Sequence, residues 1–332
     1  MTGPDAGSPS ALHVNDAAYT GANLVAEARR RGWRWDLMPK AAEAQDWSGV
    51  IGRARKALLG GSWLARLAVA ARSHDVVHVH SASTLHHTRP AAPRFVLHCH
   101  GTDVRTTQYD PRRTDEIRAG LRDAEAVFYS TPDLAEHVLP HRADATLLPV
   151  PVDVDALPCW QPAPGRPQVV FASRWEAVKG LEAQLDVAER LVATLGDRVE
   201  VVGLDWGPDA QEAARRGVRL VPRLDHAAYL RLLAGASAVV GQSAGILSAS
   251  ELEAMGTGAP LVVPVELPLY AASAPPVVGG SVDGAVEAVT ELLSGGQGHD
   301  PDRVRGWVRA THGTAKGVET VAAVYRSVVA AR

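Results

Sequence analysis

Two short stretches of the sequence carry residues suited to holding a diphosphate. The first is SRWEAVKG, in which Arg174 and Lys179 lie on a predicted loop between a strand and a helix. An arginine fork and a lysine point charge together suit two phosphoryl groups, because both anions need neutralising if one of them is to leave. Two such cations are also common on a solvated loop. The first stretch therefore indicates a diphosphate site only in combination with the second stretch.

The second stretch, GQSAGILSASELEAMGTGAP at 241–260, consists of small residues followed by Glu251 and Glu253. Small residues let a backbone approach a ligand closely, and Ser248 and Ser250 are favoured residues at the start of a helix. The unpaired N–H groups and the dipole of a helix N-terminus attract anions. A carboxylate within a turn of that end would repel a bound phosphate. We therefore expect it to be directed at something else, such as sugar hydroxyls. The pattern indicates a nucleotide-like ligand; the alternative is ordinary packing of a loop and helix under a sheet.

The composition is that of a globular protein with room for two domains. The chain has 332 residues, of which 46% are hydrophobic, and 34 Lys and Arg stand against 37 Asp and Glu, for a net charge of -3. A nucleic-acid-binding domain would be clearly basic, so the composition disfavours that class. At this length we expect two domains of ordinary size.

The cysteines and the apolar runs bear on the compartment. Cys99 and Cys159 are the two cysteines, and neither belongs to a C-x-x-C pair. The sequence therefore predicts no disulfide framework and no structural zinc site, and a reducing, cytoplasmic setting fits. The first ten residues lack the apolar core of a signal peptide, and no apolar run approaches the roughly 20 residues of a membrane-spanning helix. We expect a protein that is not integral to a membrane.

Short apolar runs alternate with helical patterns along the whole chain, which is typical of parallel sheets with crossover helices. The helical patterns include 21–31, 114–123, 181–195 and 314–330. The strand candidates begin at Ala11, Asp75, Arg94, Glu125 and Ala145 in the first half, and at Gln168, Val199, Arg219, Ser237 and Ala259 in the second. Ligands of such sheets bind outside the carboxyl ends of the strands, where both stretches fall.

A proline-rich segment divides the two series of strands, and proline prevents regular structure there. We therefore expect an α/β protein of two Rossmann-like domains facing a cleft. Residues 1–150 are expected to bind the acceptor, 151–167 to form a linker, 168–312 to bind the donor, and 313–332 to form a C-terminal helix that packs back on the first domain.

In these motifs the chain resembles the GT-B fold glycosyltransferases, and within them the retaining group called family 4. The resembling pieces span nearly the whole chain in the expected order, which is more specific than any one of them. They are DVVHVHSAS at Asp75, HCHGTDVR at His98, YSTPDLAEHVLP at Tyr129, LPVPVD at Leu148, FASRWEAVKG at Phe171 and ELEAMGTGAPLVV at Glu251.

The resemblance implies roles for particular residues. Arg174 and Lys179 match the pair that contacts the donor diphosphate, and Glu253 matches the carboxylate that holds the ribose hydroxyls. His100 matches a histidine that reaches the donor sugar, and with Arg174 and Lys179 it forms the expected catalytic set. The other residues implied at the donor site are Gly21 after the first strand and the loop of Gly245, Ile246, Leu247 and Ser248.

The sequence departs from the family pattern at one position. The family has a second glutamate eight residues before Glu253, normally in contact with the donor sugar, and here that position is Gly245. Glu251 is a candidate substitute on the acceptor side, although its place at a helix start points it elsewhere. Gln242, which precedes the small-residue loop, suggests a variant subgroup. The change leaves the identity of the donor sugar open.

The resemblance also implies the reaction, a metal-independent hexosyl transfer from a nucleotide-diphosphate sugar to a small-molecule, glycan or lipid acceptor, with no cofactor. The acceptor attacks on the face from which the leaving group departs, and the departing phosphate takes its proton. Two other functions fit the motifs: a pseudo-glycosyltransferase that couples an unusual activated sugar or cyclitol to a non-sugar nucleophile, and a catalytically silent nucleotide-sugar-binding subunit. An epimerase on the same fold is more remote. The Ala/Arg/Gly-rich composition suggests a bacterial source, with specialised-metabolite or cell-envelope synthesis as settings.

Histidines recur at a spacing of two on the predicted strands, as His78 with His80 and His98 with His100. Side chains two apart in a strand share a face, and such pairs can bind zinc. No carboxylate or cysteine completes a convincing set, so we expect no metal and assign the histidines to strand-end packing and donor contact. Asp103 is expected to orient His100.

Segment 48–74 contains five basic residues and no acidic one before Asp75. With its leucines and tryptophan it resembles a basic amphipathic segment broken at Gly60 and Gly61. It is either a packed helix pair with a solvated basic face or a peripheral membrane contact. Three tryptophans in the first domain are either acceptor-stacking or core residues: Trp33, Trp35 and Trp47.

Overall fold

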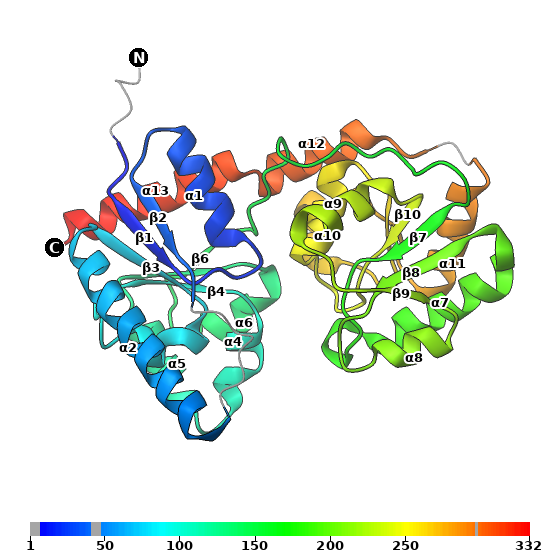
Figure 1. Cartoon of the computed structure of the whole chain (residues 1–332). Helices are drawn as coiled ribbons and strands as arrows, with labels where there is room; N and C mark the ends of the chain where they lie inside the picture. The colour runs from blue at the N-terminus through cyan, green and yellow to red at the C-terminus, as the bar shows by residue number, and fades with distance from the viewer. Residues whose placement is uncertain (1–6, 41–47, 296–297) are drawn as a thin grey trace, which may run out of the picture. The chain divides into compact units, whose positions relative to one another are not determined.

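The chain folds into two α/β units. A computed structural model describes residues 7–40, 48–295 and 298–332 (Figure 1). The first unit comprises Met1–Pro151 with Thr314–Arg332, and the second comprises Val152–Gly313. The alternation of apolar runs and helical patterns predicted this class of fold, and the structure confirms it.

The first unit is built on a six-stranded, wholly parallel sheet. In spatial order its strands are β2 (Trp35–Met38), β1 (Ala11–Val14), β3 (Val76–His80), β4 (Val96–Cys99), β5 (Ala126–Tyr129) and β6 (Thr146–Leu147). Its helices are α1 (Thr20–Arg30), α2 (Gly49–Arg72), α3 (Leu85–Thr88), α4 (Thr102–Arg105), α5 (Thr114–Asp123), α6 (Ala135–Val138) and α13 (Thr314–Ala330).

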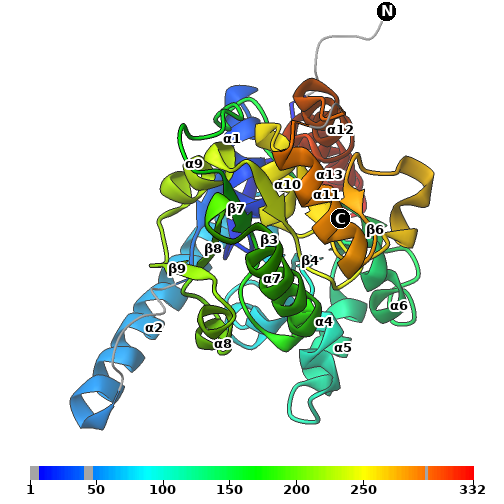
Figure 2. The same ribbon diagram turned by 90° about the vertical axis from the view of Figure 1, so that its right-hand side faces the viewer.

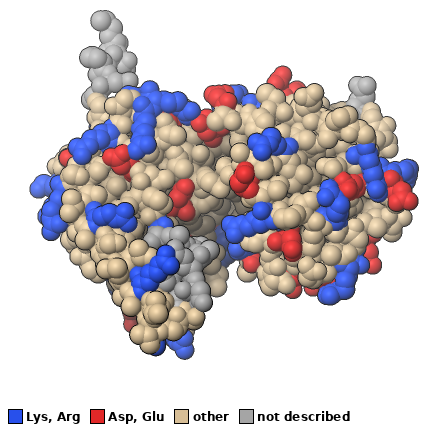
Figure 3. Space-filling view, viewed as in Figure 1, with Lys and Arg blue, Asp and Glu red and all other residues tan. Residues whose placement is uncertain are grey.

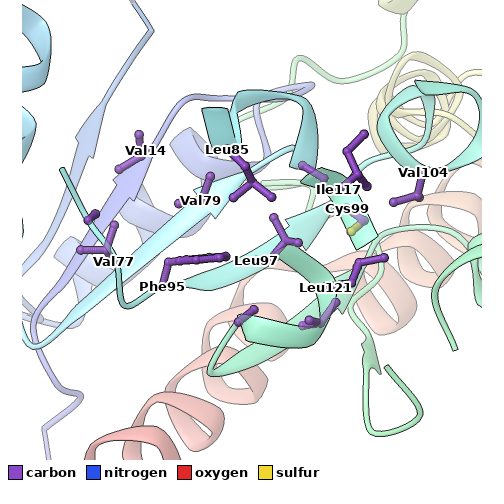
Figure 4. Packing of buried hydrophobic residues seen from close by; sticks show 14 of the residues in the cluster. Val14, Val77, Val79, Leu85, Phe95, Leu97, Cys99, Val104, Ile117 and Leu121 are labelled. Carbon is purple, nitrogen blue, oxygen red and sulfur yellow. The ribbon is translucent and has the colours of Figure 1, made fainter. Parts of the chain in front are cut away.

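Alternation along the strands divides the first unit's core into two layers. Val14, Val79 and Leu97 point to one face, where they pack with Leu85 and Leu121 from the helices (Figure 4). The opposite face packs on α1 and α13 through a second cluster of buried residues that includes Leu24, Trp35, Phe128, Val321 and Tyr325. The C-terminal helix therefore belongs to the first unit, as expected from the sequence.

The second unit repeats this construction. Its parallel strands, in spatial order, are β12 (Val278–Gly279), β11 (Leu261–Val263), β10 (Ala238–Val240), β7 (Gln168–Phe171), β8 (Glu200–Leu204) and β9 (Arg219–Val221). Its helices are α7 (Leu181–Leu195), α8 (Ala210–Arg215), α9 (His226–Gly235), α10 (Ala249–Thr257), α11 (Val282–Leu293) and α12 (Pro301–His312), with a short 3-10 turn η4 (Ala177–Lys179) after β7.

Two features differ from the sequence-based expectation. Helix α2 is continuous through Gly60 and Gly61, so the predicted break there is wrong. Each glycine costs a helix only about 1 kcal/mol, which the flanking helix formers offset. Residues of the expected linker belong to the second unit, where the Trp160 indole donates to the carbonyl of Ala236 at 2.7 Å and the Trp160 N–H donates to Thr257 at 2.8 Å.

The tryptophans of the first unit have separate environments. Trp35 on β2 is fully buried, and its indole N–H lies 3.2 Å from both the Ser8 Oγ and the Pro9 carbonyl. Trp33 packs against the same cluster and lies under the Arg31 guanidinium. Trp47 lies outside the described residues. Trp35 is therefore a core residue and not an acceptor-stacking one.

Candidate functional site

The two sequence stretches meet at the carboxyl edge of the second unit's sheet. Strands β7 and β10 are neighbours, so the loops that follow them leave the sheet side by side. The Ser243 N–H donates to the Lys179 carbonyl at 3.1 Å, and the Ser243 hydroxyl donates to the Gly180 carbonyl at 2.8 Å. Gly180 has φ +71°, and a Cβ there would lie 1.8 Å from the Ser243 Oγ. This junction therefore requires glycine and fixes one loop against the other.

The Glu251 side chain stabilises the loop before α10 by accepting hydrogen bonds from it. It is fully buried, and its carboxylate accepts the backbone N–H groups of Gln242 at 2.5 Å and Ser248 at 2.6 Å. It also accepts the Ser248 hydroxyl at 2.8 Å, and of the two predicted candidates, Ser248 and Ser250, it is Ser248 that lies at the start of the helix. Burial raises the pKa of Glu251, while these hydrogen bonds and the nearby Lys179 charge oppose the rise. Since its oxygens are used inside the loop, Glu251 organises the loop from within.

The remaining loop residues surround this carboxylate. A Cβ on Gly241 would lie 2.8 Å from the Glu251 Oε1, which explains the small residue there. The Gln242 amide donates to the Ile246 carbonyl at 3.1 Å, and the Leu247 N–H donates to the Tyr270 hydroxyl at 3.1 Å. Gly245 has φ +73°, and a Cβ added to it would meet no atom within 4 Å. The position at which the family carries a glutamate is thus open space.

The predicted ligand-binding side chains of this unit are paired within the protein. Arg174 forms an ion pair with Glu176 at 2.5 Å, and its guanidinium lies 5.7 Å from the Trp206 ring centre. The nearly buried Glu253 accepts a hydrogen bond from His226 at 2.7 Å, if that nitrogen carries the proton. A planar guanidinium has five N–H donors, so one carboxylate leaves Arg174 able to bind more.

Sequence reasoning missed the partners Glu176, Trp206 and His226. Each follows a strand of this sheet, and Trp206 comes two residues after β8. The available signal was position at a carboxyl end of a strand, because such residues gather on one edge. Trp206 is 36% exposed, and the Arg223 guanidinium lies 4.7 Å from its ring centre, so two cations lie near one aromatic ring.

In the first unit, strand pairing brings histidines from three neighbouring strands together. His13 on β1 is in register with His78 on β3, and His80 on β3 is in register with His98 on β4. All four are fully buried on the face covered by α1 and α13, while His100, just after β4, is partly exposed. The pairs at spacing two do share a face as predicted. His13 was missed because a single histidine in a strand carries no periodic signal.

The buried histidines are neutral. Burial lowers the pKa of His13 to about 3 and that of His100 to about 4, although the Asp103 charge partly opposes the shift at His100. Burial also lowers the pKa values of His78, His80 and His98 well below their ordinary range. The cluster (His13, His78, His80, His98 and His100) therefore carries no charge at neutral pH.

Asp103 and Asp16 organise the loops around this cluster. The buried Asp103 carboxylate accepts the N–H groups of His100 at 3.1 Å and Gly101 at 2.9 Å, and through its other oxygen that of Ala82 at 2.8 Å. It thus ties the loop after β4 to the loop after β3. The Gly21 N–H donates to Asp16 at 2.9 Å, and a Cβ on Gly21 would lie 3.2 Å from the His80 Nε2. Gly21 therefore covers the histidine cluster closely.

Two sets of histidine nitrogens lie close enough to hold a metal ion. One is His13, His78 and His80, and the other is His80, His98 and His100; the nitrogens of each set lie within 4.8 Å of one another. Nearly all of them are hydrogen-bonded within the cluster or to Tyr325 and Ser130, an arrangement that neutral imidazoles satisfy without an ion.

Comparison with known proteins identifies the fold. No protein-family model matches the sequence, and no curated protein matches it. Among solved structures, HepE from Anabaena, in complex with UDP and glucose, is similar with a TM-score of 0.67, 13% identity and coverage of 96% of this chain and 100% of that one. AviGT4, a glycosyltransferase involved in avilamycin A biosynthesis, is similar with a TM-score of 0.63, 19% identity and coverage of 98% and 99%.

A third similar structure carries another activity. A putative UDP-N-acetylglucosamine 2-epimerase from Listeria monocytogenes has a TM-score of 0.58, 16% identity and coverage of 96% of both chains. At these identities the likenesses show the fold, and the two units have the GT-B architecture predicted from the motifs. The activity has to be argued from the site.

Proposed function

We propose that this protein is a glycosyltransferase that moves a sugar from a nucleotide-diphosphate donor to an acceptor. The observation that carries the proposal is the hydrogen-bonded junction of the two loops at the edge of the second unit's sheet. It places Lys179 beside the loop that leads to the N-terminus of α10, with Arg174 on the same loop as Lys179. We infer that these cations and the helix N-terminus together bind a diphosphate, since both attract anions.

The chemistry follows from charge. When the bond between the sugar and the phosphate breaks, negative charge grows on the leaving diphosphate and positive charge grows on the sugar ring. Arg174, Lys179 and backbone N–H groups are suited to stabilise that diphosphate without a metal ion. We propose retention of configuration: the acceptor oxygen bonds to the anomeric carbon on the face that the diphosphate leaves, and its proton passes to a phosphate oxygen.

The similar structures support this choice and suggest the first donors to try. HepE was solved with UDP and glucose, and AviGT4 is a glycosyltransferase involved in avilamycin A biosynthesis. We propose that a UDP-hexose is the first donor to test, that Glu253 holds the ribose, and that the absence of a side chain at Gly245 changes how the sugar is held.

Donor turnover tests the proposal. The protein is incubated with UDP-, GDP-, ADP- and TDP-sugars in the presence of EDTA and a panel of small-molecule and glycan acceptors, with water as the acceptor in a parallel series, and release of the nucleoside diphosphate is measured. We expect release from one donor class, its loss in Arg174→Ala, and its persistence in Arg190→Ala, a surface arginine of the same unit that is also ion-paired. Epimerised donor without release would contradict the proposal and favour the epimerase activity. Binding without turnover would contradict it and favour a silent subunit.

We also propose that α2 contacts an anionic bilayer, which would suit a lipid acceptor. Trp63 and Leu67 are the buried residues of this helix, and about half a turn away its outer side presents Ile51, Leu58 and Val69 to solvent. Figure 2 shows α2 extending away from its sheet. In Figure 3, viewed as in Figure 1, the lower left of the molecule carries Lys and Arg side chains (blue) among residues without charge (tan). Apolar residues flanked by cations suit a membrane surface. The cations along this helix are Arg53, Arg55, Lys56, Arg66 and Arg72.

Vesicle co-sedimentation tests this contact. None of the helices in the described ranges has both the length and the apolar composition needed to span a bilayer, so attachment would be at the surface. We expect binding to vesicles with anionic lipid, weakened by salt and by the double change Ile51→Ser and Leu58→Ser. Equal recovery with neutral vesicles, or no effect of the double change, would contradict the contact.

A further inference from the structure

An unbroken series of hydrogen bonds runs through the histidine cluster from its buried end to its exposed end. The His13 Nδ1 lies 2.9 Å from the His80 Nε2, and the His80 Nδ1 lies 3.0 Å from the His100 Nε2. The His100 Nδ1 lies 3.0 Å from the Ser130 Oγ. Each ring thus uses one nitrogen toward the interior and the other toward the carboxyl edge of the sheet.

The series continues inward through the C-terminal helix. The Tyr325 hydroxyl lies 3.2 Å from the His13 Nε2 and 2.6 Å from the His78 Nδ1. Tyr325 is fully buried, and burial raises its pKa well above the ordinary range, so it retains its proton. At the outer end the Ser130 Oγ also lies 3.1 Å from the His98 Nε2 and donates to the Cys99 carbonyl at 3.1 Å.

Counting protons allows this series two directions, and the hydrogen bond from Ser130 to the Cys99 carbonyl distinguishes them. A neutral imidazole has one N–H and one lone pair, and a hydroxyl has one proton. When the Ser130 proton goes to the Cys99 carbonyl, the Ser130 Oγ accepts from both His98 and His100. The proton of His100 is then on Nδ1, and its Nε2 accepts from the His80 Nδ1–H.

The same proton count assigns the donor and the acceptor of each hydrogen bond farther inside the cluster. His80 accepts from the His13 Nδ1–H, His13 accepts from the Tyr325 hydroxyl, and Tyr325 accepts from the His78 Nδ1–H. Every proton is used, and lone pairs are left on the His78 Nε2 and the His98 Nδ1. These are the two buried nitrogens of the cluster that have no hydrogen-bond partner in the described part of the chain.

The reverse direction is less favourable. In that direction the Ser130 hydroxyl donates to His100 and no longer to the Cys99 carbonyl. The His78 Nε2 then carries an N–H, for which no acceptor lies among the described residues. A buried donor without an acceptor costs about 1–3 kcal/mol, whereas under-satisfied acceptors are tolerated more often. Ser130 therefore decides the direction for all of the rings behind it.

We propose that Ser130 is a positioning residue that holds His100, His80, His13 and His78 as Nδ1–H tautomers and His98 as the Nε2–H tautomer. His100 is the partly exposed ring of the five, so the series determines which form of it a ligand meets. Resting on the proposed function, this gives a sugar bound at this edge of the first unit's sheet a neutral ring whose two nitrogens are held by His80 and Ser130, so that His100 orients the sugar and does not act as a base.

Nitrogen NMR of protein labelled with ¹⁵N-histidine tests the proposal without any donor. At neutral pH the wild-type protein is expected to show Nδ1–H tautomers for four of the cluster rings and an Nε2–H tautomer for His98. In Ser130→Ala the acceptor for His100 is lost, and we expect the protons of His100, His80, His13 and, through Tyr325, His78 to move to Nε2. Ser130→Thr keeps the hydroxyl and is expected to restore the wild-type pattern.

The control is Thr131→Val, which removes a neighbouring buried hydroxyl that has no hydrogen-bond partner in the described structure. It is expected to leave the tautomers unchanged. A wild-type spectrum with His13, His80 and His100 as Nε2–H tautomers would overturn the proposal, and so would an unchanged His13 in Ser130→Ala, because a purely local role of Ser130 would not reach that ring.

Turnover then separates the two proposals. If the transferase activity is present, Ser130→Ala is expected to lower kcat about tenfold, as loss of one positioning hydrogen bond predicts, with recovery in Ser130→Thr. The predicted tautomers in a protein with no transferase activity would support the positioning of His100 and contradict the proposed function.

Discussion

Lowering the pH from about 7.5 to about 5.5 is expected to destabilise the first unit strongly through its buried histidines. Burial lowers the pKa values of all five cluster rings, to about 3 for His13 and about 4 for His100. Their ordinary pKa, which they regain in the unfolded chain, is about 6.5. The stability they contribute is thus complete above pH 6.5 and is lost as the pH falls toward 4, because the unfolded chain then binds protons that the folded unit cannot.

The size of the effect follows from proton linkage. At about pH 5.5 each unfolded histidine is about 90% protonated, and the free energy of unfolding falls by about 1.3 kcal/mol per ring relative to pH 7.5. Five rings together give about 7 kcal/mol. Since whole domains are stable by about 5–15 kcal/mol, this loss would leave the first unit marginal.

Urea unfolding at a series of pH values measures this loss. The slope of the unfolding free energy near pH 5.5 should correspond to an uptake of about 4.5 protons, and the change His98→Asn should reduce the uptake by about one. Changing the exposed His87 to Asn should reduce it far less. An uptake of fewer than two protons in the wild-type protein would refute the neutral, buried cluster.

Three further changes have expected outcomes. Glu251→Ala removes the buried acceptor of two backbone N–H groups and should lower the free energy of unfolding by about 3 kcal/mol in urea titrations; a loss below about 0.5 kcal/mol would contradict its role in the loop. Gly60→Ala and Gly61→Ala meet open space in a continuous helix and should each stabilise it by about 1 kcal/mol, whereas no gain in Tm would argue against that helix. Gly245→Glu should cost about 1–2 kcal/mol because of its φ of +73° and should change KM for the donor, and an unchanged KM would place the sugar away from this position.

Much of the fold was predictable because its strands are apolar runs between helical patterns. Strand β2 was missed because WDLM contains Asp36 and lies at an edge of the sheet, where Trp35 is its fully buried residue. Strand β12 has two residues, too few for a periodic signal. The continuity of α2 could not be read from its two glycines, because their cost is small beside the helix formers around them.

The site was predictable as far as the loops and not as far as their internal partners. The resemblance assigned both loops to the donor site, and the Ser243 contacts to Lys179 and Gly180 show that the loops after β7 and β10 meet. The pairing of Glu253 with His226 depends on side-chain geometry across two helices, which no local pattern encodes. His13 joins the histidine cluster only through strand register, which a sequence does not state.

The most direct test of the central claim is a calorimetric titration with UDP, GDP, ADP and TDP, comparing the wild-type protein with Arg174→Ala and with Arg190→Ala as the control. A nucleotide-sugar transferase should bind one nucleoside diphosphate, and Arg174→Ala should weaken its Kd about 10- to 100-fold, as expected for a lost hydrogen bond to a charged group, while Arg190→Ala binds normally. If no nucleoside diphosphate binds, or if Arg174→Ala binds as tightly as the wild type, the diphosphate site on the second unit is not where we place it.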